Sequence, residues 1–241
     1  MTQTIAANVM ASTARSYDEV PYIGGAFPET HPNRLATLGT LFGMQPVDPL
    51  RCRVLELGCA QGKNLIPMAS TAPHSEFIGI DLSAKQIDVG KNWIAQLRLG
   101  NIELRQQNIL ELTSDIGSFD YIIAHGVLSW VPQVVQEKIF DLCQQLLAPQ
   151  GIAYLSYNTY PGWHFRDILR NQLCFHTRNA VDERQKFQQA EEYLGILQLA
   201  AKNHPGIYGD VLQAQIDLLR QSRDYYVFHD FLEEVNSPFY F

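Results

Sequence analysis

Residues 53–62 read Arg-Val-Leu-Glu-Leu-Gly-Cys-Ala-Gln-Gly, and residues 77–81 read Phe-Ile-Gly-Ile-Asp. The first stretch is a short apolar run that passes into a glycine-rich turn, and the second is an apolar run that ends on a single acid, Asp81. This order predicts a strand, a turn, a helix and a second strand with a carboxylate at its tip. Open α/β sheets hold adenosine-bearing cofactors in this way, so the two stretches predict an α/β fold with a cofactor site.

The spacing within the turn separates two kinds of cofactor. A dinucleotide turn needs small residues at its first, third and sixth positions, because helix and strand approach closely there. Those positions hold Gly58, Ala60 and Lys63, and the lysine spoils that approach. Small residues stand instead at Gly58, Ala60 and Gly62, with Glu56 two positions ahead of the first glycine. This stretch closely resembles the motif of class I methyltransferases that depend on S-adenosylmethionine (SAM).

The chemistry of a sulfonium cofactor agrees with this turn. SAM carries no phosphate, so the turn need not offer a nest of amides to a dianion. It needs backbone without Cβ atoms, against which the amino acid and ribose parts can lie, and Gly58 and Gly62 supply it. A nicotinamide-dependent oxidoreductase remains the alternative, and Lys63 at the sixth position of the turn argues against it.

The bulk properties limit the partners and the location. The chain has 241 residues, 46% of them hydrophobic, which is enough for one α/β domain with a helical extension. The net charge is −7 and no dense run of Lys and Arg is present, so nucleic acid is not expected as a partner. No apolar stretch approaches the roughly 20 residues that span a bilayer, and the N-terminus lacks the pattern of a signal peptide. These features predict a cytoplasmic protein without membrane contact, and they leave its oligomeric state open.

The four cysteines are scattered without a C-x-x-C pair or histidines at ligand spacing. The sequence therefore predicts neither a disulfide framework nor a metal site. Cys59 lies within the glycine turn, where the favoured interpretation is a small buried residue and the alternative is a thiol that senses oxidation.

The chain divides into three predicted parts. Residues 1–45 are irregular apart from a short helix from Asn33 or Arg34 to Phe42. They are interpreted as a lid over the cofactor, with a plain N-terminal flap as the alternative. Residues 46–160 form the SAM-binding core, and residues 161–241 form a helical extension. Strands are expected at 53–57, 76–80, 102–106, 121–124 and 152–157, and helices of the extension at 165–178, 182–202 and 211–235.

Two helices of the core have readable ends. Ser83 and Gln86 form a predicted capping box, followed by an inward stripe of Ile87, Ile94 and Leu97. The other helix begins near Pro132 and continues at helical spacing until Pro149-Gln-Gly151 ends it. The short connections agree with right-handed crossovers in a parallel sheet.

Four further segments resemble one bacterial subfamily of class I methyltransferases, whose members carry a C-terminal methyltransferase regulatory domain. They are Tyr17-Asp-Glu-Val-Pro-Tyr22, Thr30-His-Pro-Asn-Arg-Leu-Ala-Thr-Leu38, His125-Gly-Val-Leu-Ser-Trp-Val-Pro132 and Ser156-Tyr-Asn-Thr-Tyr-Pro-Gly-Trp163. The chain is similar in this respect to rickettsial protein lysine methyltransferases. The resemblance implies a Rossmann-like fold with a mostly parallel, seven-stranded sheet. Because the chain ends near Phe241, where longer relatives enter the regulatory domain, its last helices are expected to be the start of that domain.

The cofactor residues are predicted from their places at strand ends. Asp81 should accept hydrogen bonds from the ribose hydroxyls, with capping of the next helix as its alternative role. Asn108 stands where the family usually has an aspartate for the adenine amino group, although loop formation alone would also explain it. Glu56 is expected near the amino acid end of SAM, or as a brace of the turn. The full predicted set is Glu56, Gly58, Cys59, Ala60, Gly62, Asn64, Asp81, Leu82, Asn108, Ile109, His125 and Gly126.

The acceptor side is predicted from the ends of the fourth and fifth strands. His125, Tyr157 and Asn158 are the candidate catalytic residues, with an orienting role favoured for His125 over that of a base. The candidate substrate-binding residues are Tyr17, Tyr22, Trp130 and Tyr160. The predicted reaction is in-line attack of an acceptor on the sulfonium methyl with release of S-adenosylhomocysteine, without a metal. The acceptor is a protein lysine or a small-molecule amine or hydroxyl, and the other alternative is a SAM-binding partner or sensor without transfer.

Overall fold

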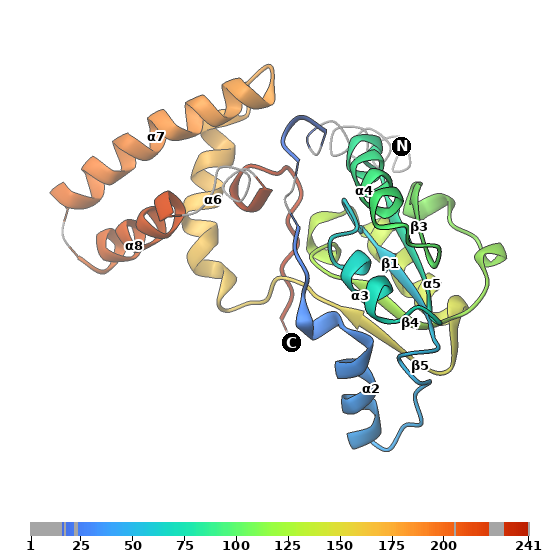
Figure 1. The fold of residues 1–241 in the computed structure, drawn as a ribbon. Helices are drawn as coiled ribbons and strands as arrows, with labels where there is room; N and C mark the ends of the chain where they lie inside the picture. Colours follow the sequence, from blue (N-terminus) through green and yellow to red (C-terminus); the bar gives the residue numbers. More distant parts are fainter. Residues whose placement is uncertain (1–15, 17, 22–23, 205, 222–228, 241) are drawn as a thin grey trace. The chain divides into compact units, whose positions relative to one another are not determined.

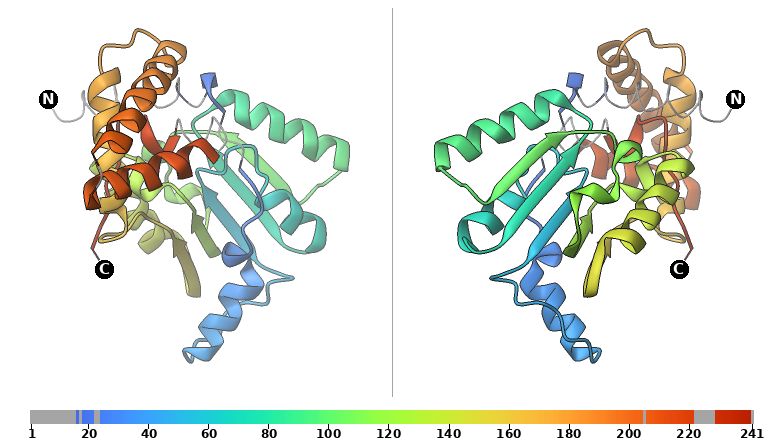
Figure 2. Two further views of the ribbon diagram at one scale, coloured as in Figure 1. Left: turned by 90° about the vertical axis from the view of Figure 1, so that its left-hand side faces the viewer. Right: turned by 90° about the vertical axis from the view of Figure 1, so that its right-hand side faces the viewer.

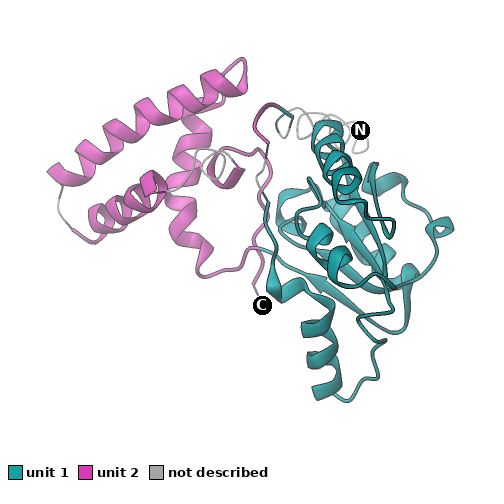
Figure 3. Ribbon diagram, in the orientation of Figure 1, with its two compact units in different colours: residues 1–18, 23–157 teal, residues 19–22, 158–241 magenta. Residues whose placement is uncertain are grey.

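The computed structural model describes residues 16, 18–21, 24–204, 206–221 and 229–240 (Figure 1). The chain forms two compact units, shown in different colours in Figure 3. Unit 1 comprises residues 1–18 and 23–157, and unit 2 comprises residues 19–22 and 158–241. Each unit has its own hydrophobic core, and each is described by itself.

Unit 1 is built on a parallel sheet of five strands in the order β3-β2-β1-β4-β5. This confirms the predicted α/β class. The seven strands implied by the family resemblance are wrong for the described residues, because the chain becomes helical after β5 and adds no further strand to the sheet. The strands are β1 (Arg53–Leu57), β2 (Glu76–Asp81), β3 (Ile102–Gln106), β4 (Phe119–Ala124) and β5 (Leu147–Leu155).

The strand order reverses between β1 and β4. The chain moves from β1 outward to β3 through α3 (Leu65–Thr71) and α4 (Ala84–Leu97), then returns to β4 beside β1 and continues through α5 (Gln133–Leu146) to β5. Right-handed crossovers place α3 and α4 on one face of the sheet and α5 on the other, as the views in Figure 2 show. The carboxyl ends of β1 and β4 therefore diverge into different loops, and such a switch point is where open α/β sheets bind ligands.

The N-terminal part of unit 1 contributes η1 (Pro28–Thr30) and α2 (Pro32–Leu41), close to the short helix predicted from the sequence. Further short turns of 3₁₀ helix are η2 (Ile109–Glu111) after β3, η3 (Ser114–Ile116) before β4 and η4 (Leu128–Trp130) after β4. The loops at the carboxyl ends of the strands thus carry their own local structure.

The fifth strand differs from its prediction. It begins at Leu147, directly after α5, and not at Ile152. Pro149 does not separate helix from strand, because it lies in an irregular part of β5 where the register against β4 shifts between Phe119 and Tyr121. Proline is tolerated there because β5 is the edge strand of the sheet and the ladder is already interrupted.

The capping of α4 is confirmed in part. Ser83 Oγ accepts a hydrogen bond from Gln86 N at 3.2 Å, as predicted. Among the described residues the Gln86 side chain does not accept the reciprocal bond from Ser83 N, which donates instead to Asp81 Oδ1 at 2.9 Å. Leu97 was predicted to face inward and is 57% exposed. A 14-residue helix is about 21 Å long and a five-residue strand about 17 Å, so the last turn of α4 extends past the strand that it covers.

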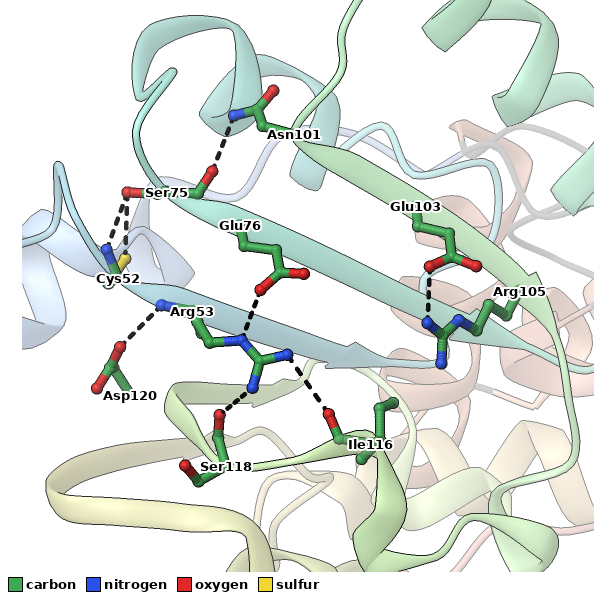
Figure 4. A network of polar contacts seen from close by, with 10 residues as sticks. All are labelled: Cys52, Arg53, Ser75, Glu76, Asn101, Glu103, Arg105, Ile116, Ser118 and Asp120. Carbon is green, nitrogen blue, oxygen red and sulfur yellow. Dashed lines mark hydrogen bonds and ion pairs between the residues drawn. The ribbon is translucent and has the colours of Figure 1, made fainter.

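A polar network fixes the amino ends of the strands, opposite to the site edge (Figure 4). The Arg53 guanidinium pairs with Glu76 at 2.6 Å and donates to Ser118 O at 2.6 Å, while Arg53 N donates to Asp120 Oδ2 at 2.8 Å. Asn101 Nδ2 adds a bond to Ser75 O at 3.0 Å. These bonds join β1, β2 and the loops before β3 and β4, so this end of the sheet is a structural clamp.

Unit 2 contains α6 (Trp163–Thr177), α7 (Glu183–Asn203) and α8 (Ile207–Gln221). The first two confirm predicted helices within two residues, whereas α8 begins earlier than the predicted residue 211 and ends at Gln221. Phe231 and Leu232 are fully buried in the core of this unit, and His229 Nδ1 lies 2.9 Å from Glu233 Oε1.

The described residues also bear on membrane and metal binding. None of the helices in those residues is long and apolar enough to cross a bilayer. The same residues include no group of three or more His, Cys, Asp or Glu side chains placed to hold a metal ion.

Candidate cofactor site

The glycine turn between β1 and α3 has a strained backbone that only certain residues adopt. Gly58 and Gly62 have φ values of 75° and 71°, and Ala60 has a φ of 48°. The turn is attached to the end of β2, because the amides of Gly58 and Cys59 both donate to Ile80 O, at 2.8 and 3.0 Å. Glycine is favoured at positions 58 and 62 because it enters the left-handed region without steric cost.

The two glycines are also required by packing inside the unit. A Cβ atom on Gly58 would lie 2.4 Å from Val127 Cγ2, and one on Gly62 would lie 2.8 Å from Leu104 Cδ1. The sequence reasoning assigned these glycines to the cofactor alone. The structure gives a second reason, since the side chains of the η4 and β3 regions occupy the space that a Cβ would take.

We expect Gly58→Ala to destabilise the protein by about 3 kcal/mol, from the left-handed backbone together with the collision with Val127. Urea unfolding would measure the loss. Gly100→Ala is the matched control, because Gly100 has nothing within 4 Å of its added Cβ. Equal midpoints for the two variants would contradict the packing argument.

Asp81 joins the glycine turn to the start of α4. Its Oδ2 accepts from Ala60 N at 2.8 Å, and its Oδ1 accepts from Ser83 N at 2.9 Å. Burial raises the pKa of this carboxyl, and the hydrogen bonds from the Ser83, Ala60 and Leu82 amides oppose the rise. Asp81 therefore also caps the start of α4, which is the alternative role that the sequence predicted for it. A carboxylate has about four acceptor positions, so the hydrogen bonds at 2.8 and 2.9 Å from Ala60 N and Ser83 N leave capacity for further donors such as a ribose hydroxyl.

A second carboxylate, Asp18, stands next to Asp81. Asp18 Oδ1 accepts from Ser83 Oγ at 2.5 Å, and the Asp18 carbonyl accepts from Lys85 Nζ at 3.1 Å. Its charge contributes to the raised pKa of Asp81. The sequence reasoning missed this residue, although it lies within the quoted Tyr17–Tyr22 segment. Tyr17 and Tyr22 themselves lie outside the described residues.

Glu56 begins a series of buried hydrogen bonds on the other side of the turn. Its Oε1 accepts from Asn64 Nδ2 at 2.8 Å, while its Oε2 is buried without a hydrogen-bond partner. Burial is the main cause that raises the pKa of Glu56 to about 8. Asn64 also donates to Thr30 Oγ1 at 2.9 Å and accepts from Phe27 N at 3.0 Å. These hydrogen bonds thus tie the segment before α2 to the glycine turn.

His125 follows β4 and lies between two rings. Its ring centroid is 4.0 Å from that of Phe27 and 5.9 Å from that of Tyr154. Its Nδ1 lies 3.2 Å from Ser156 Oγ, and Gly126 N donates to the same hydroxyl at 2.7 Å. Burial lowers the pKa of His125, and the charge of Glu29 opposes this in part. The imidazole is therefore neutral at physiological pH.

Two further predicted residues have local structural roles. Asn108 Oδ1 accepts from Leu110 N at 3.0 Å and caps η2, so loop formation accounts for an asparagine there. Ile109 is buried directly after it. Burial raises the pKa of the Cys59 thiol well above its usual range, which disfavours the thiolate and supports the small buried residue over the oxidation sensor.

The predicted acceptor residues fall in both units. Trp130 ends η4 in unit 1, and Tyr157, which is 42% exposed, is the last residue of that unit. In unit 2, Asn158 Nδ2 donates to Asn236 Oδ1 at 2.9 Å and the Tyr160 hydroxyl donates to Asp167 Oδ2 at 2.9 Å. A common pocket for these four residues stays a prediction.

Comparison with known proteins agrees with the fold and the turn. A family model described as a methyltransferase domain matches residues 50–229. The parallel sheet, the glycine turn and the acid at the tip of β2 thus agree with a methyltransferase domain, and the chain belongs to the methyltransferase domain family.

Several similar proteins come from Rickettsia. The chain is 41% identical to the uncharacterized protein RP789 of Rickettsia prowazekii, over 93% of this chain and 41% of that protein. It is 39% identical to the uncharacterized protein RP028 of the same organism, over 94% of this chain and 90% of that protein. It also matches the structure of PKMT2 from Rickettsia typhi in complex with AdoHcy, with a TM-score of 0.81 and 40% identity, over 92% of this chain and 42% of that one. The chain therefore spans about two fifths of the length of RP789 and PKMT2.

Proposed function

We propose that this chain is a SAM-dependent methyltransferase that moves the sulfonium methyl to an acceptor and releases S-adenosylhomocysteine. The observation that carries the proposal is the glycine turn held to Asp81 through the Ala60 amide at 2.8 Å. The proposal is also supported by the 40% identity to PKMT2, whose structure is a complex with AdoHcy.

The described residues fit SAM by the chemistry of their donors and acceptors. Asp81 keeps acceptor capacity for the two ribose hydroxyls, and Asn108 with Ile109 stands after β3 for the adenine. Glu56 and Asn64 form the buried end of the turn, where the amino acid part of SAM would be held. Leu82, Cys59 and Gly126 complete the proposed contacts. SAM supplies the activated methyl, so alignment by the protein is the main contribution required of the chain.

The acceptor side is proposed around His125, with Tyr157 and Asn158 as orienting groups and Trp130 and Tyr160 as walls. Tyr17, Tyr22 and Phe27 are proposed to belong to the N-terminal lid. Its attachment has structural support in the bond between Phe27 N and Asn64 Oδ1. The acceptor classes are a protein lysine and a small-molecule amine or hydroxyl. Membership of the subfamily with a C-terminal regulatory domain is also part of this proposal.

The test combines binding and transfer. We expect calorimetric titration to show uptake of SAM and S-adenosylhomocysteine and none of NAD, and we expect labelled methyl groups from SAM to enter an acceptor in fractionated lysate. Mass spectrometry of the labelled fraction would identify that acceptor. Uptake of NAD alone would contradict the proposal, and uptake of SAM without transfer would favour the binding partner or sensor.

A further inference from the structure

The hydroxyl of Ser156 lies at the centre of a small network around His125. It is 2.7 Å from Gly126 N and 3.2 Å from His125 Nδ1. Among the residues that the structure describes, these are its hydrogen-bond partners, and His125 Nε2 has none. The ends of two neighbouring strands thus meet, since His125 and Gly126 follow β4 and Ser156 follows β5.

The donor count in this network favours one position for the imidazole proton. An amide N–H can only donate, so Ser156 Oγ accepts from Gly126. The serine hydroxyl has one proton, and Nδ1 of His125 is the acceptor within reach. Nδ1 accepts only when it carries no proton, which in a neutral imidazole leaves the proton on Nε2. The opposite tautomer would leave the hydroxyl proton without an acceptor among the described groups.

The environment of the ring keeps it neutral and in place. Phe27 covers His125 at a centroid distance of 4.0 Å, and Tyr154 lies at 5.9 Å. Burial lowers the pKa of His125, and Glu29 is the charged group that opposes this. Phe27 is itself held through its amide to Asn64 Oδ1 at 3.0 Å. The residue that covers the imidazole is therefore tied to the glycine turn.

We propose that Ser156 is a positioning residue that holds His125 in the tautomer with the proton on Nε2. His125 then serves the transfer site as a hydrogen-bond donor through Nε2 and not as a base at that atom. The use of that donor in methyl transfer rests on the proposed function, whereas the tautomer does not. An acceptor amine must consequently lose its proton to another group or to water.

The test is a long-range proton–nitrogen NMR spectrum of the ¹⁵N-labelled chain, with the His125 signals assigned by their loss in His125→Gln. We expect an unprotonated Nδ1 and a protonated Nε2. In Ser156→Ala the two nitrogen shifts should converge, because the tautomers mix, and Ser156→Thr should restore the original pattern. Ser70→Ala is the matched control, since the Ser70 hydroxyl donates to Pro67 O within its own helix.

A protonated Nδ1 in the unaltered protein would overturn the proposal, and this reading needs no Ser156 variant. An unchanged His125 signature in a folded Ser156→Ala variant would also overturn it. Addition of S-adenosylhomocysteine to the same sample tests the proposed function separately. Failure to bind would contradict that function and leave the tautomer result as it stands.

Discussion

Replacing Asp81 by alanine is expected to weaken SAM binding by about 100-fold or more, because hydrogen bonds to a charged acceptor contribute about 1.5–3 kcal/mol each and the ribose offers two. The same change leaves the Ala60 and Ser83 amides without their acceptor, so the turn and the start of α4 should also lose stability. Calorimetry and thermal unfolding measure the two effects.

The control for Asp81→Ala is Asp120→Ala. Asp120 also accepts a backbone amide, that of Arg53 at 2.8 Å, but it does so at the amino ends of the strands, opposite to the site. We expect this control to lose stability while it keeps its affinity for SAM. Asp81→Asn separates the effects further, since it keeps one oxygen for an amide and removes the charge. Unaltered SAM uptake by a folded Asp81→Ala protein would remove Asp81 from the site.

The second large effect is expected from Glu56→Gln. Burial raises the pKa of Glu56 from 4.5 to about 8 in the folded protein. Between these values the folded state holds a proton that the unfolded chain has released, so stability falls as pH rises through this window. A glutamine cannot ionise and still offers an oxygen to Asn64 Nδ2. We therefore expect Glu56→Gln to be more stable than the unaltered protein by about 3 kcal/mol at pH 7, with no gain below the pKa of the unfolded chain.

Urea unfolding at a series of pH values tests the Glu56 prediction. Glu103→Gln is the control, because Glu103 is an exposed partner of Arg105 at 2.7 Å and its pKa is lowered, not raised. Its removal should change stability little, and it should leave the fall between pH 4.5 and 8 in place. A parallel pH dependence for Glu56→Gln and the unaltered protein would show that Glu56 does not hold its proton in the folded state.

Local patterns were sufficient for much of the fold. The strands β1 and β3 have the predicted bounds, and β2 is one residue longer than predicted. These strands are central or pair over their whole length, and their apolar runs end at turn residues. The predictions failed where the outcome depended on the surrounding fold and not on the local pattern. The strand β5 starts earlier than predicted because an edge strand tolerates Pro149. Leu97 is exposed because the last turn of α4 extends past the strand that it covers.

The sequence by itself determined the α/β class, the glycine turn and the acid at the tip of the second strand, because short windows encode period, turn chemistry and strand ends. Only the tertiary structure decided which groups those ends bring together. Ser156 meets His125 across 31 positions, Asp18 meets Ser83 across 65, and Asn64 meets Thr30 across 34. The first contact follows from strand order, which places the carboxyl ends of β4 and β5 side by side at one edge of the sheet. In the other two, a residue of the N-terminal segment meets the loop that follows β2 or β1.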